Sequence, residues 1–217
     1  MHVLLTAGPT YEPLDPVRFL GNRSTGKMGY ALAEAFAAAN ADVTLVSGPT
    51  ALSAPTSARI SLVRVETAQQ MYEAAAAVAP RVDVWVFAAA VADYRPAEVA
   101  PEKIKKQGDT LTLTLVKNVD IAATLGQAKR PEQFSVGFAL ETTNELAHAQ
   151  EKLHRKNFDL VVLNSLRDAG AGFGHDTNKV SVLDAAGQVL TFDLQAKTEL
   201  AHRLVQLILS RFAVSYA

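Results

Sequence analysis

The stretch LLTAGPTYEPLDPVRFLGNRSTGKMGYALAEAFAAA, residues 4–39, decides the fold, because an apolar strand runs into a loop rich in glycine and proline and then into a helix. A strand that ends at Gly8 and a helix that begins near Gly26 leave about seventeen residues between them, whereas βα connections in α/β units usually have about 2 to 6. Loops of this length are usually functional or disordered. Strong helix signals follow this one, so we expect it to carry the function.

The helix after the loop has one apolar face and a start suited to an anion. Ser24 or Thr25 is expected to cap it. Its first turn then presents backbone N–H groups, the positive end of the helix dipole and the ammonium of Lys27, a combination that favours a phosphate or a carboxylate. The apolar residues recur at helical spacing: Met28, Ala31, Leu32, Ala35, Phe36 and Ala39.

Two familiar nucleotide-binding motifs fit this loop only in part. Residues 21–27, GNRSTGK, have the spacing of a P-loop, but Met28 follows where a P-loop needs a hydroxyl for the metal ion. The G-x-G-x-x-G dinucleotide pattern is also absent, since Gly26 and Gly29 supply only its last two glycines. The loop therefore favours neither a P-loop nucleotide-binding protein nor a plain NAD enzyme.

Composition sets limits on partners and environment. The 217 residues are 49% hydrophobic, enough for one sizeable core, and we expect a single domain over residues 1–217. Lys plus Arg is 21 against 22 Asp plus Glu, so no nucleic-acid partner is indicated. Cysteine is absent and no apolar run is long enough to span a membrane, so we expect a cytoplasmic protein without a membrane partner.

The rest of the chain alternates between apolar runs and helical patterns, which predicts an α/β, Rossmann-like three-layer fold with a mostly parallel sheet. Residues 110–116 alternate Thr and Leu and predict a half-exposed strand in a small β-arm or hairpin, about residues 105–117. A second hairpin is expected over 180–183 and 189–192. Further strands are expected at 42–49, 61–65, 84–90, 134–139 and 160–163, and helices at 67–79, 121–127, 144–157 and 195–212.

Several charged residues are candidates for a site, each with a simpler alternative. Asp93 follows a buried strand with three alanines before it, at the sheet edge where α/β proteins bind ligands, but it is also suited to capping a turn. Lys103 lies in the basic cluster 101–106, which is otherwise a solvated face. Lys152 and Lys156 share one helix face and have the same alternative. The glycine-rich residues 167–176 predict a mobile or closely approaching loop. The five histidines show no metal-ligand spacing.

Eight segments together resemble one family, the bacterial phosphopantothenoylcysteine synthetases of coenzyme A biosynthesis. They follow the same order, span nearly the whole chain, and begin with the longest and most specific. They are TAGPTYEPLDPVRFLGNRSTGKMG (6–29), TLVSGP (44–49), AAAVADYRP (88–96), APEKIKK (100–106), KNVDI (117–121), VGFALET (136–142), RKN (155–157) and GFGHDTNKV (172–180).

The resemblance implies a ligase that joins 4′-phosphopantothenate to L-cysteine at the expense of CTP, with bound Mg²⁺. The substrate carboxylate attacks the α-phosphate of the nucleotide, pyrophosphate leaves, and the cysteine amine opens the resulting acyl-cytidylate to an amide. Most bacterial relatives carry a fused flavin-dependent decarboxylase, so such a domain, fused or separate, is an expected partner. The family also forms homodimers, for which the arm is the candidate surface.

The resemblance also assigns roles to residues. Asn22 is expected to contact the acyl intermediate, Lys103 to act as the catalytic cation on the phosphates, and Arg18 to hold the substrate together with Gly26 and Lys27. Residues 172–176 are expected to form a lid or a nearby wall. The expected CTP site comprises Ala88, Ala89, Asp93, Lys103, Val119, Asp120, Ile121, Ala122, Phe138, Lys152 and Lys156.

Some positions depart from the pattern expected of the family, and a second class of function stays open. Thr25 and Arg23 stand where Ser and His are common, Val119 replaces a proline and Leu140 an alanine. The alternative function is a non-catalytic or redox Rossmann-like module that binds a dinucleotide. The absence of G-x-G-x-x-G argues against that alternative.

Overall fold

The structure is a computed structural model that describes residues 1–217 except 107, 142, 166–171, 173 and 216–217. In the described chain the main sheet has the strand order β12-β11-β10-β9-β6-β1-β4-β5. The strands from β10 to β5 are parallel, whereas β11 and β12 run antiparallel to their neighbours. The strands are β1 (His2–Ala7), β4 (Asp42–Ser47), β5 (Ile60–Arg64), β6 (Val84–Phe87), β9 (Phe134–Glu141), β10 (Leu160–Ser165), β11 (Thr177–Asp184) and β12 (Val189–Ala196).

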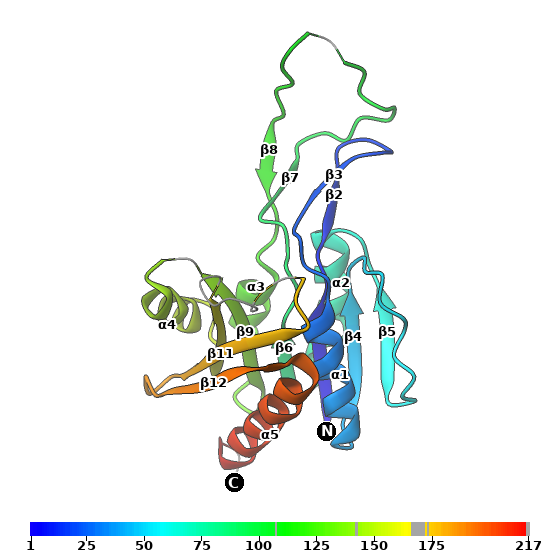
Figure 1. The fold of residues 1–217 in the computed structure, drawn as a ribbon. Helices are drawn as coiled ribbons and strands as arrows, with labels where there is room; N and C mark the ends of the chain where they lie inside the picture. Colours follow the sequence, from blue (N-terminus) through cyan, green and yellow to red (C-terminus); the bar gives the residue numbers. More distant parts are fainter. Residues whose placement is uncertain (107, 142, 166–171, 173, 216–217) are drawn as a thin grey trace.

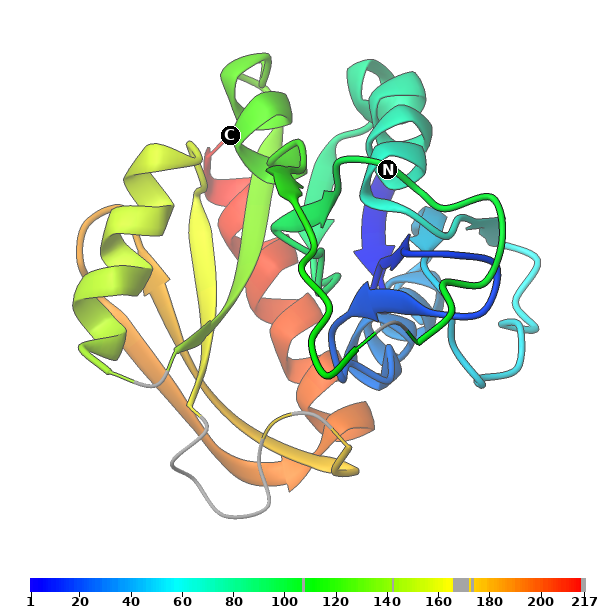
Figure 2. The ribbon, with the colours of Figure 1, turned by 90° about the horizontal axis from the view of Figure 1, so that it is seen from above.

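Helices cover both faces of the sheet, which confirms the predicted three-layer α/β fold (Figures 1 and 2). On one face α1 (Lys27–Ala38) and α5 (Lys197–Ser215) pack against side chains such as Leu5 and Val86. On the other face α2 (Ala68–Val78), α3 (Ile121–Gln127) and α4 (Glu145–Arg155) pack against Leu4 and Trp85. Consecutive strand residues thus enter opposite cores, which explains why these strands read as continuous apolar runs.

The long loop between β1 and α1 contains a short hairpin that the sequence pattern did not predict. Its strands β2 (Tyr11–Pro13) and β3 (Phe19–Gly21) are antiparallel. The rings of Tyr11 and Phe19 stack across it with centroids 3.8 Å apart. Three residues per strand are too few to give an alternating pattern, so this hairpin has no periodic signal.

The predicted cap of α1 is wrong. The residue before the helix is Gly26, at φ 79°, and no side chain caps the first turn. Ser24 instead accepts a hydrogen bond from the Gly26 N–H at 3.3 Å, and the Thr25 carbonyl accepts one from the Thr50 hydroxyl at 2.8 Å. The left-handed backbone at Gly26 turns the chain into the helix, so a glycine takes the place that a capping hydroxyl was expected to fill.

The arm projects beyond the carboxyl edge of the main sheet (Figure 1). At its base β7 (Tyr94–Pro96) pairs antiparallel with β8 (Leu115–Lys117), and the Ala97 N–H donates to the Thr114 carbonyl. The predicted strand over 110–116 is therefore wrong for residues 110–114. Its Thr and Leu side chains are all exposed, so the alternation does not reflect a buried face.

The remaining elements lie close to the predicted bounds. A 3-10 turn, η1 (Ala79–Arg81), follows α2, and the predicted helices and hairpin differ from α2 to α5 and from β11–β12 by a few residues at their ends. Trp85 is 1% exposed, as expected for a core residue. In the described part of the chain no helix has the length and hydropathy needed to cross a membrane. The glycine-rich residues 167–176 fall mostly outside the described residues.

Gly29 fixes the distance between α1 and β1. A Cβ atom added at Gly29 would lie 2.5 Å from the Ala7 Cβ. We predict that Gly29→Ala lowers the free energy of unfolding by about 1–3 kcal/mol, because the methyl group overpacks this contact. Ala7→Gly removes the atom that it meets, so the double variant should be more stable than the sum of the single changes predicts. Urea unfolding of the four proteins measures this coupling, and strictly additive effects would contradict the close approach.

Candidate active site

A cleft with two adjoining cavities lies along the carboxyl edge of the parallel strands. The first cavity, of about 300 Å³, lies beside the start of α1 and reaches β10, β11 and the start of α5. The second cavity, of about 530 Å³, lies between the residues that follow β6 and the first turn of α3, with α4 behind them. Both are lined by Ala89, Val91, Phe138 and Lys152, so the two cavities adjoin each other at these residues.

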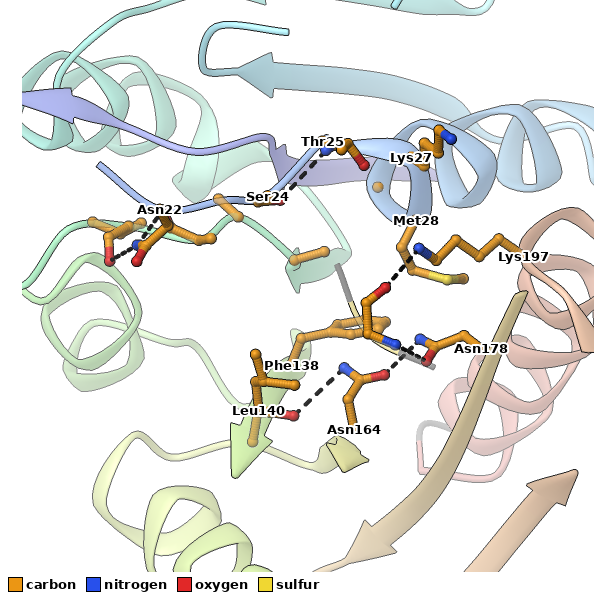
Figure 3. A pocket seen from close by; sticks show the side chains of 18 of the residues that line it. Asn22, Ser24, Thr25, Lys27, Met28, Phe138, Leu140, Asn164, Asn178 and Lys197 are labelled. Atoms are coloured by element: carbon orange, nitrogen blue, oxygen red, sulfur yellow. Dashed lines mark hydrogen bonds between the residues drawn. The ribbon is translucent and has the colours of Figure 1, made fainter. Parts of the chain in front are cut away.

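The long loop forms one wall of the first cavity (Figure 3). The Asn22 amide donates to the carbonyls of Ala90 and Val91, at 3.0 and 3.2 Å, and so holds the loop against the chain that follows β6. Met28 extends from α1 toward Lys197, whereas Lys27 lies on the other side of the helix (Figure 3). The first turn of α1 therefore borders the cavity with its backbone N–H groups, and an anion there lies at the positive end of the helix.

The opposite wall of the first cavity is a polar corner. Asn178 donates to the Asn164 side-chain oxygen at 2.6 Å. The buried Lys197 ammonium donates to the carbonyls of Gly172 and His175, at 3.0 and 2.6 Å. Burial lowers the pKa of Lys197, and the nearby charge of Lys27 lowers it further. The side chains of this corner are held in place by their own hydrogen bonds and form the far wall of the cavity.

The sequence analysis did not identify this corner. Asn164 follows the predicted strand 160–163, and a polar residue at that carboxyl edge is the signal that points to it. Asn178 lies in the family-like segment 172–180 but is assigned no role by the resemblance, and Lys197 at the start of α5 carries no comparable signal. Of the predicted lid residues 172–176, the described ones are Gly172, Gly174, His175 and Asp176, and Gly172 lines the first cavity.

Three lysines of the cleft, Lys27, Lys152 and Lys156, contact carboxylates. Lys27 contacts Asp176 at 2.6 Å, and the hydrogen bond from Lys27 lowers the pKa of Asp176. Lys152 contacts Glu141 at 2.5 Å. The predicted use of Lys152 as a phosphate clamp thus requires an anion to compete with, or join, a carboxylate that is already in place.

The second cavity is lined by a further ion pair, between Asp120 and Lys156. Asp120 caps α3 by accepting from the Ala123 N–H at 3.1 Å and contacts Lys156 at 2.9 Å. Burial by itself raises the pKa of Asp120, but the hydrogen bonds from Lys156 and Ala123 outweigh it, and the net shift is downward. Asp93 lies exposed at the rim. The cavity is therefore lined by apolar side chains such as Phe138 together with several charged groups.

The structure brings most of the predicted site residues into this cleft. Phe138 and Lys152 line both cavities, whereas Arg18 and Lys103 line neither and belong to the arm region. Among the described residues no group of three His, Asp or Glu side chains is arranged to hold a metal ion. The first cavity holds Asn22, Gly26, Lys27, Ala88 and Ala89, and the second holds Ala89, Asp93, Val119, Asp120, Ile121, Ala122 and Lys156.

Comparison with known proteins shows the family of this chain. Residues 1–212 match the family model described as DNA/pantothenate metabolism flavoprotein C-terminal domain. The chain belongs to this family. A similar solved structure is the crystal structure of the C-terminal domain of coenzyme A biosynthesis bifunctional protein CoaBC. The two sequences are 42% identical, and the structures align with a TM-score of 0.80 over 95% of this chain and 93% of that one.

Full-length relatives carry two different names. The bifunctional protein CoaBC of Escherichia coli (strain K12) is 44% identical over 98% of this chain and 52% of its own length. A cysteine/cysteine sulfinic acid decarboxylase from an unknown prokaryotic organism is 46% identical over 96% of this chain and 58% of its own length. The chain thus spans about half the length of the curated relatives that it matches.

The pair between Asp120 and Lys156 gives a pKa prediction. Lys156→Gln removes the cation and leaves the burial, so the pKa of Asp120 should rise. Carboxyl carbon NMR during an acid titration measures it. Lys152→Gln, one helical turn earlier on α4, is the matched control and should leave Asp120 unchanged. Because the native pKa of Asp120 is lowered, the pair stabilises the fold at neutral pH, and this stabilisation is lost as the pH falls through that pKa.

An unchanged Asp120 pKa in Lys156→Gln would contradict the ion pair between Asp120 and Lys156.

Proposed function

We propose that this chain is a phosphopantothenate–cysteine ligase that joins 4′-phosphopantothenate to L-cysteine in coenzyme A biosynthesis, with CTP as co-substrate. The observation that carries the proposal is the pair of adjoining cavities that share Phe138 and Lys152, since a reaction between a nucleotide and an acid needs two sites that meet. The CoaBC names of the relatives support the same pathway. The alternative, a dinucleotide-binding module, lacks the glycine pattern that such a module needs.

The nucleotide is proposed to occupy the larger second cavity. Ala89, which lines both cavities, and Ala88, which lines the first cavity beside it, leave room for the base and ribose near the end of β6, and Asp93 accepts hydrogen bonds from the ribose. The residues 119–122, Phe138 and Lys156 complete this site. Mg²⁺ is usually held by phosphates and one or two carboxylates, and among the described residues no three acidic or histidine side chains gather to hold it, so the nucleotide phosphates would supply most of its ligands. When bound, Mg²⁺ would neutralise phosphate charge.

The acid substrate is proposed to lie in the first cavity, against the start of α1. Gly26 and Lys27 hold its negative group through the backbone at the start of α1, and Phe138 and Lys152 mark the junction where its carboxylate meets the nucleotide. That carboxylate attacks the α-phosphorus of CTP, the bond to the bridging oxygen breaks, and pyrophosphate leaves with the electron pair. The product of this step is an acyl-cytidylate. The neutral amine of cysteine then attacks its carbonyl carbon, CMP leaves, and the amine proton is lost to solvent.

Asn22 and Lys103 are proposed to serve different steps. Asn22 borders the first cavity and is held by two carbonyls, so its amide has a fixed place beside the acyl group. Lys103 is an exposed cation that offsets the charge that develops as pyrophosphate leaves. Arg18 is proposed to help hold the substrate from the hairpin side. Residues 172–176 are proposed to close the far side of the first cavity.

The arm is the proposed surface for a homodimer. Leu111 and Leu115 are 55% and 42% exposed on it, and Val17 and Phe19 are exposed on the neighbouring hairpin. A set of exposed apolar side chains on two adjacent projections is typical of a protein interface. A flavin-dependent decarboxylase, fused or separate, is the further proposed partner, and the cytoplasm the proposed compartment.

Pyrophosphate release tests the proposed reaction. Purified protein is incubated with Mg²⁺, 4′-phosphopantothenate and either CTP or ATP, with and without cysteine. We expect sustained pyrophosphate release only when cysteine is present, and with CTP but not with ATP. Without cysteine, release should stop early, because the acyl-cytidylate accumulates when no amine is there to attack it. Release without 4′-phosphopantothenate, or none under any condition, would contradict the proposal. Thermal stabilisation by NADP but not by CTP would favour the dinucleotide module instead.

Two variants separate the steps. Lys103→Gln should lower the rate of pyrophosphate release by about a hundredfold or more, because it removes a charge that acts in the transition state. Asn22→Asp should still release one equivalent of pyrophosphate but form the amide slowly. Lys105→Gln, which changes a neighbouring exposed lysine in the same way, is the control and should stay within about twofold of the parent rate. Equal loss of both steps in Lys103→Gln and Asn22→Asp would contradict the assigned roles.

The proposed dimer gives a further prediction. Leu111→Asp and Leu115→Asp place charges on the arm, so sedimentation equilibrium should show a shift from dimer to monomer. Val189→Asp changes an apolar residue that is equally exposed, but on the edge strand β12, and should leave the dimer intact. A parent protein that sediments as a monomer, or arm variants that sediment as the parent does, would contradict this surface.

A further inference from the structure

The turn of the β2–β3 hairpin is hydrogen-bonded to the arm at two residues, Ala100 and Ile104. The Ala100 N–H donates to the Leu14 carbonyl at 3.0 Å. Four residues later, the Ile104 N–H donates to the Asp15 carboxylate at 3.1 Å, and the Arg18 guanidinium donates to the Ile104 carbonyl at 2.9 Å. Asp15 and Arg18 thus bind both backbone groups of one arm residue, as a neighbouring strand would.

Asp15 is the centre of this contact. Its side chain is fully buried, and one carboxylate oxygen accepts from the N–H groups of Val17 and Arg18 at 2.8 and 2.9 Å. The other oxygen accepts from the Arg18 guanidinium at 2.6 Å and from Ile104. The hydrogen bond from Arg18 holds the pKa of Asp15 well below its usual range, so the carboxylate is ionised throughout the working pH range. Hydrogen bonds to an ionised acceptor are the stronger kind.

Lys103 lies between the two anchored points. It precedes Ile104 directly and follows Ala100 by three residues. From Lys105 to Leu113, the described residues make no backbone hydrogen bond to other described residues, and the arm is next tied where Ala97 meets Thr114. The position of Lys103 in space is therefore set by the hairpin turn rather than by the base of the arm.

We propose that Asp15 is a positioning residue for Lys103: with Arg18 it clamps the Ile104 backbone, and this contact sets where the Lys103 ammonium lies during nucleotidyl transfer. The proposal rests on the proposed function for its catalytic part, whereas the clamp itself is independent of it. It also gives Arg18 a second role, because its guanidinium is engaged by Asp15 and Ile104.

Asp15→Asn tests the clamp selectively. An asparagine has the same shape, and its oxygen still accepts from the N–H groups of Val17 and Arg18, so the turn is retained. Its NH₂ group then faces the Arg18 guanidinium and the Ile104 N–H, all of them donors, so the arm contact is lost. Asp109→Asn makes the same change at an exposed position of the same arm and is the matched control.

Hydrogen exchange measured by mass spectrometry reports the clamp without any substrate. In the parent protein, the Ile104 amide should exchange about tenfold or more slowly than amides in 108–113, because only Ile104 donates to a buried group. Asp15→Asn should abolish this difference and Asp109→Asn should preserve it. An Ile104 amide that exchanges as fast as the tip in the parent overturns the clamp, and this result needs no folded variant.

Kinetics then test the positioning role. Asp15→Asn should lower kcat for pyrophosphate release by about tenfold to a hundredfold with the KM for CTP changed less than about threefold, since a displaced cation affects the transition state most. In a Lys103→Gln background, Asp15→Asn should cause no further loss, because Asp15 acts through Lys103. A further loss of similar size there, or a change confined to KM, overturns the positioning role. A parent enzyme without activity contradicts the proposed function and leaves the exchange result to decide the clamp.

Discussion

The contact among three glycines at the base of the long loop is the constraint on which the site depends. Gly8, where the loop leaves β1, and Gly26, where it returns to α1, both have left-handed backbones and lie against each other. Gly48, at the end of β4, lies so close to the loop that an added Cβ would be 1.7 Å from the Pro9 carbonyl oxygen. The close approach at Gly48 and the left-handed backbones of Gly8 and Gly26 let the loop begin and end at one point of the sheet edge.

Closing the loop at its base has two consequences for the site. The start of α1 comes to lie beside the carboxyl ends of β1 and β6, which places its backbone N–H groups at the cleft. The rest of the loop is free to project as the β2–β3 hairpin, whose turn reaches the arm (Figure 1). A single local packing requirement thus joins the anion-binding end of the helix to the segment that carries Lys103.

The cleft combines lysines in ion pairs with the buried cation of Lys197, which donates to backbone carbonyls. Lys27, Lys152 and Lys156 each contact a carboxylate, and these pairs are partly exposed. A phosphate that joins such a pair adds charge to the lysine without leaving the carboxylate, such as the mostly buried Glu141, without its cation. This arrangement agrees with a net charge of −1 for a chain proposed to bind two highly charged substrates.

Much of the fold could be predicted from the sequence, because strands buried on both faces and amphipathic helices leave periodic patterns. The site could be predicted where a motif was long, as for Asn22 and Gly26, or where a polar residue followed a strand, as for Asp93. The hairpin at residues 11–21 was missed because its strands are short, and the cap of α1 was misassigned because Gly26 replaces a hydroxyl. Lys197 was missed because its role depends on tertiary packing with Gly172 and His175, which no local pattern records.

The fate of the substrate's carboxylate oxygen tests the central claim most directly. When 4′-phosphopantothenate carries ¹⁸O in its carboxylate, attack on the α-phosphorus of CTP and later release of CMP transfer one labelled oxygen to the phosphate of CMP. Mass spectrometry of the products of a single turnover should therefore find the label in CMP and in the amide product, and none in pyrophosphate. Label in pyrophosphate or inorganic phosphate, or CMP without label, would contradict activation through an acyl-cytidylate in this cleft.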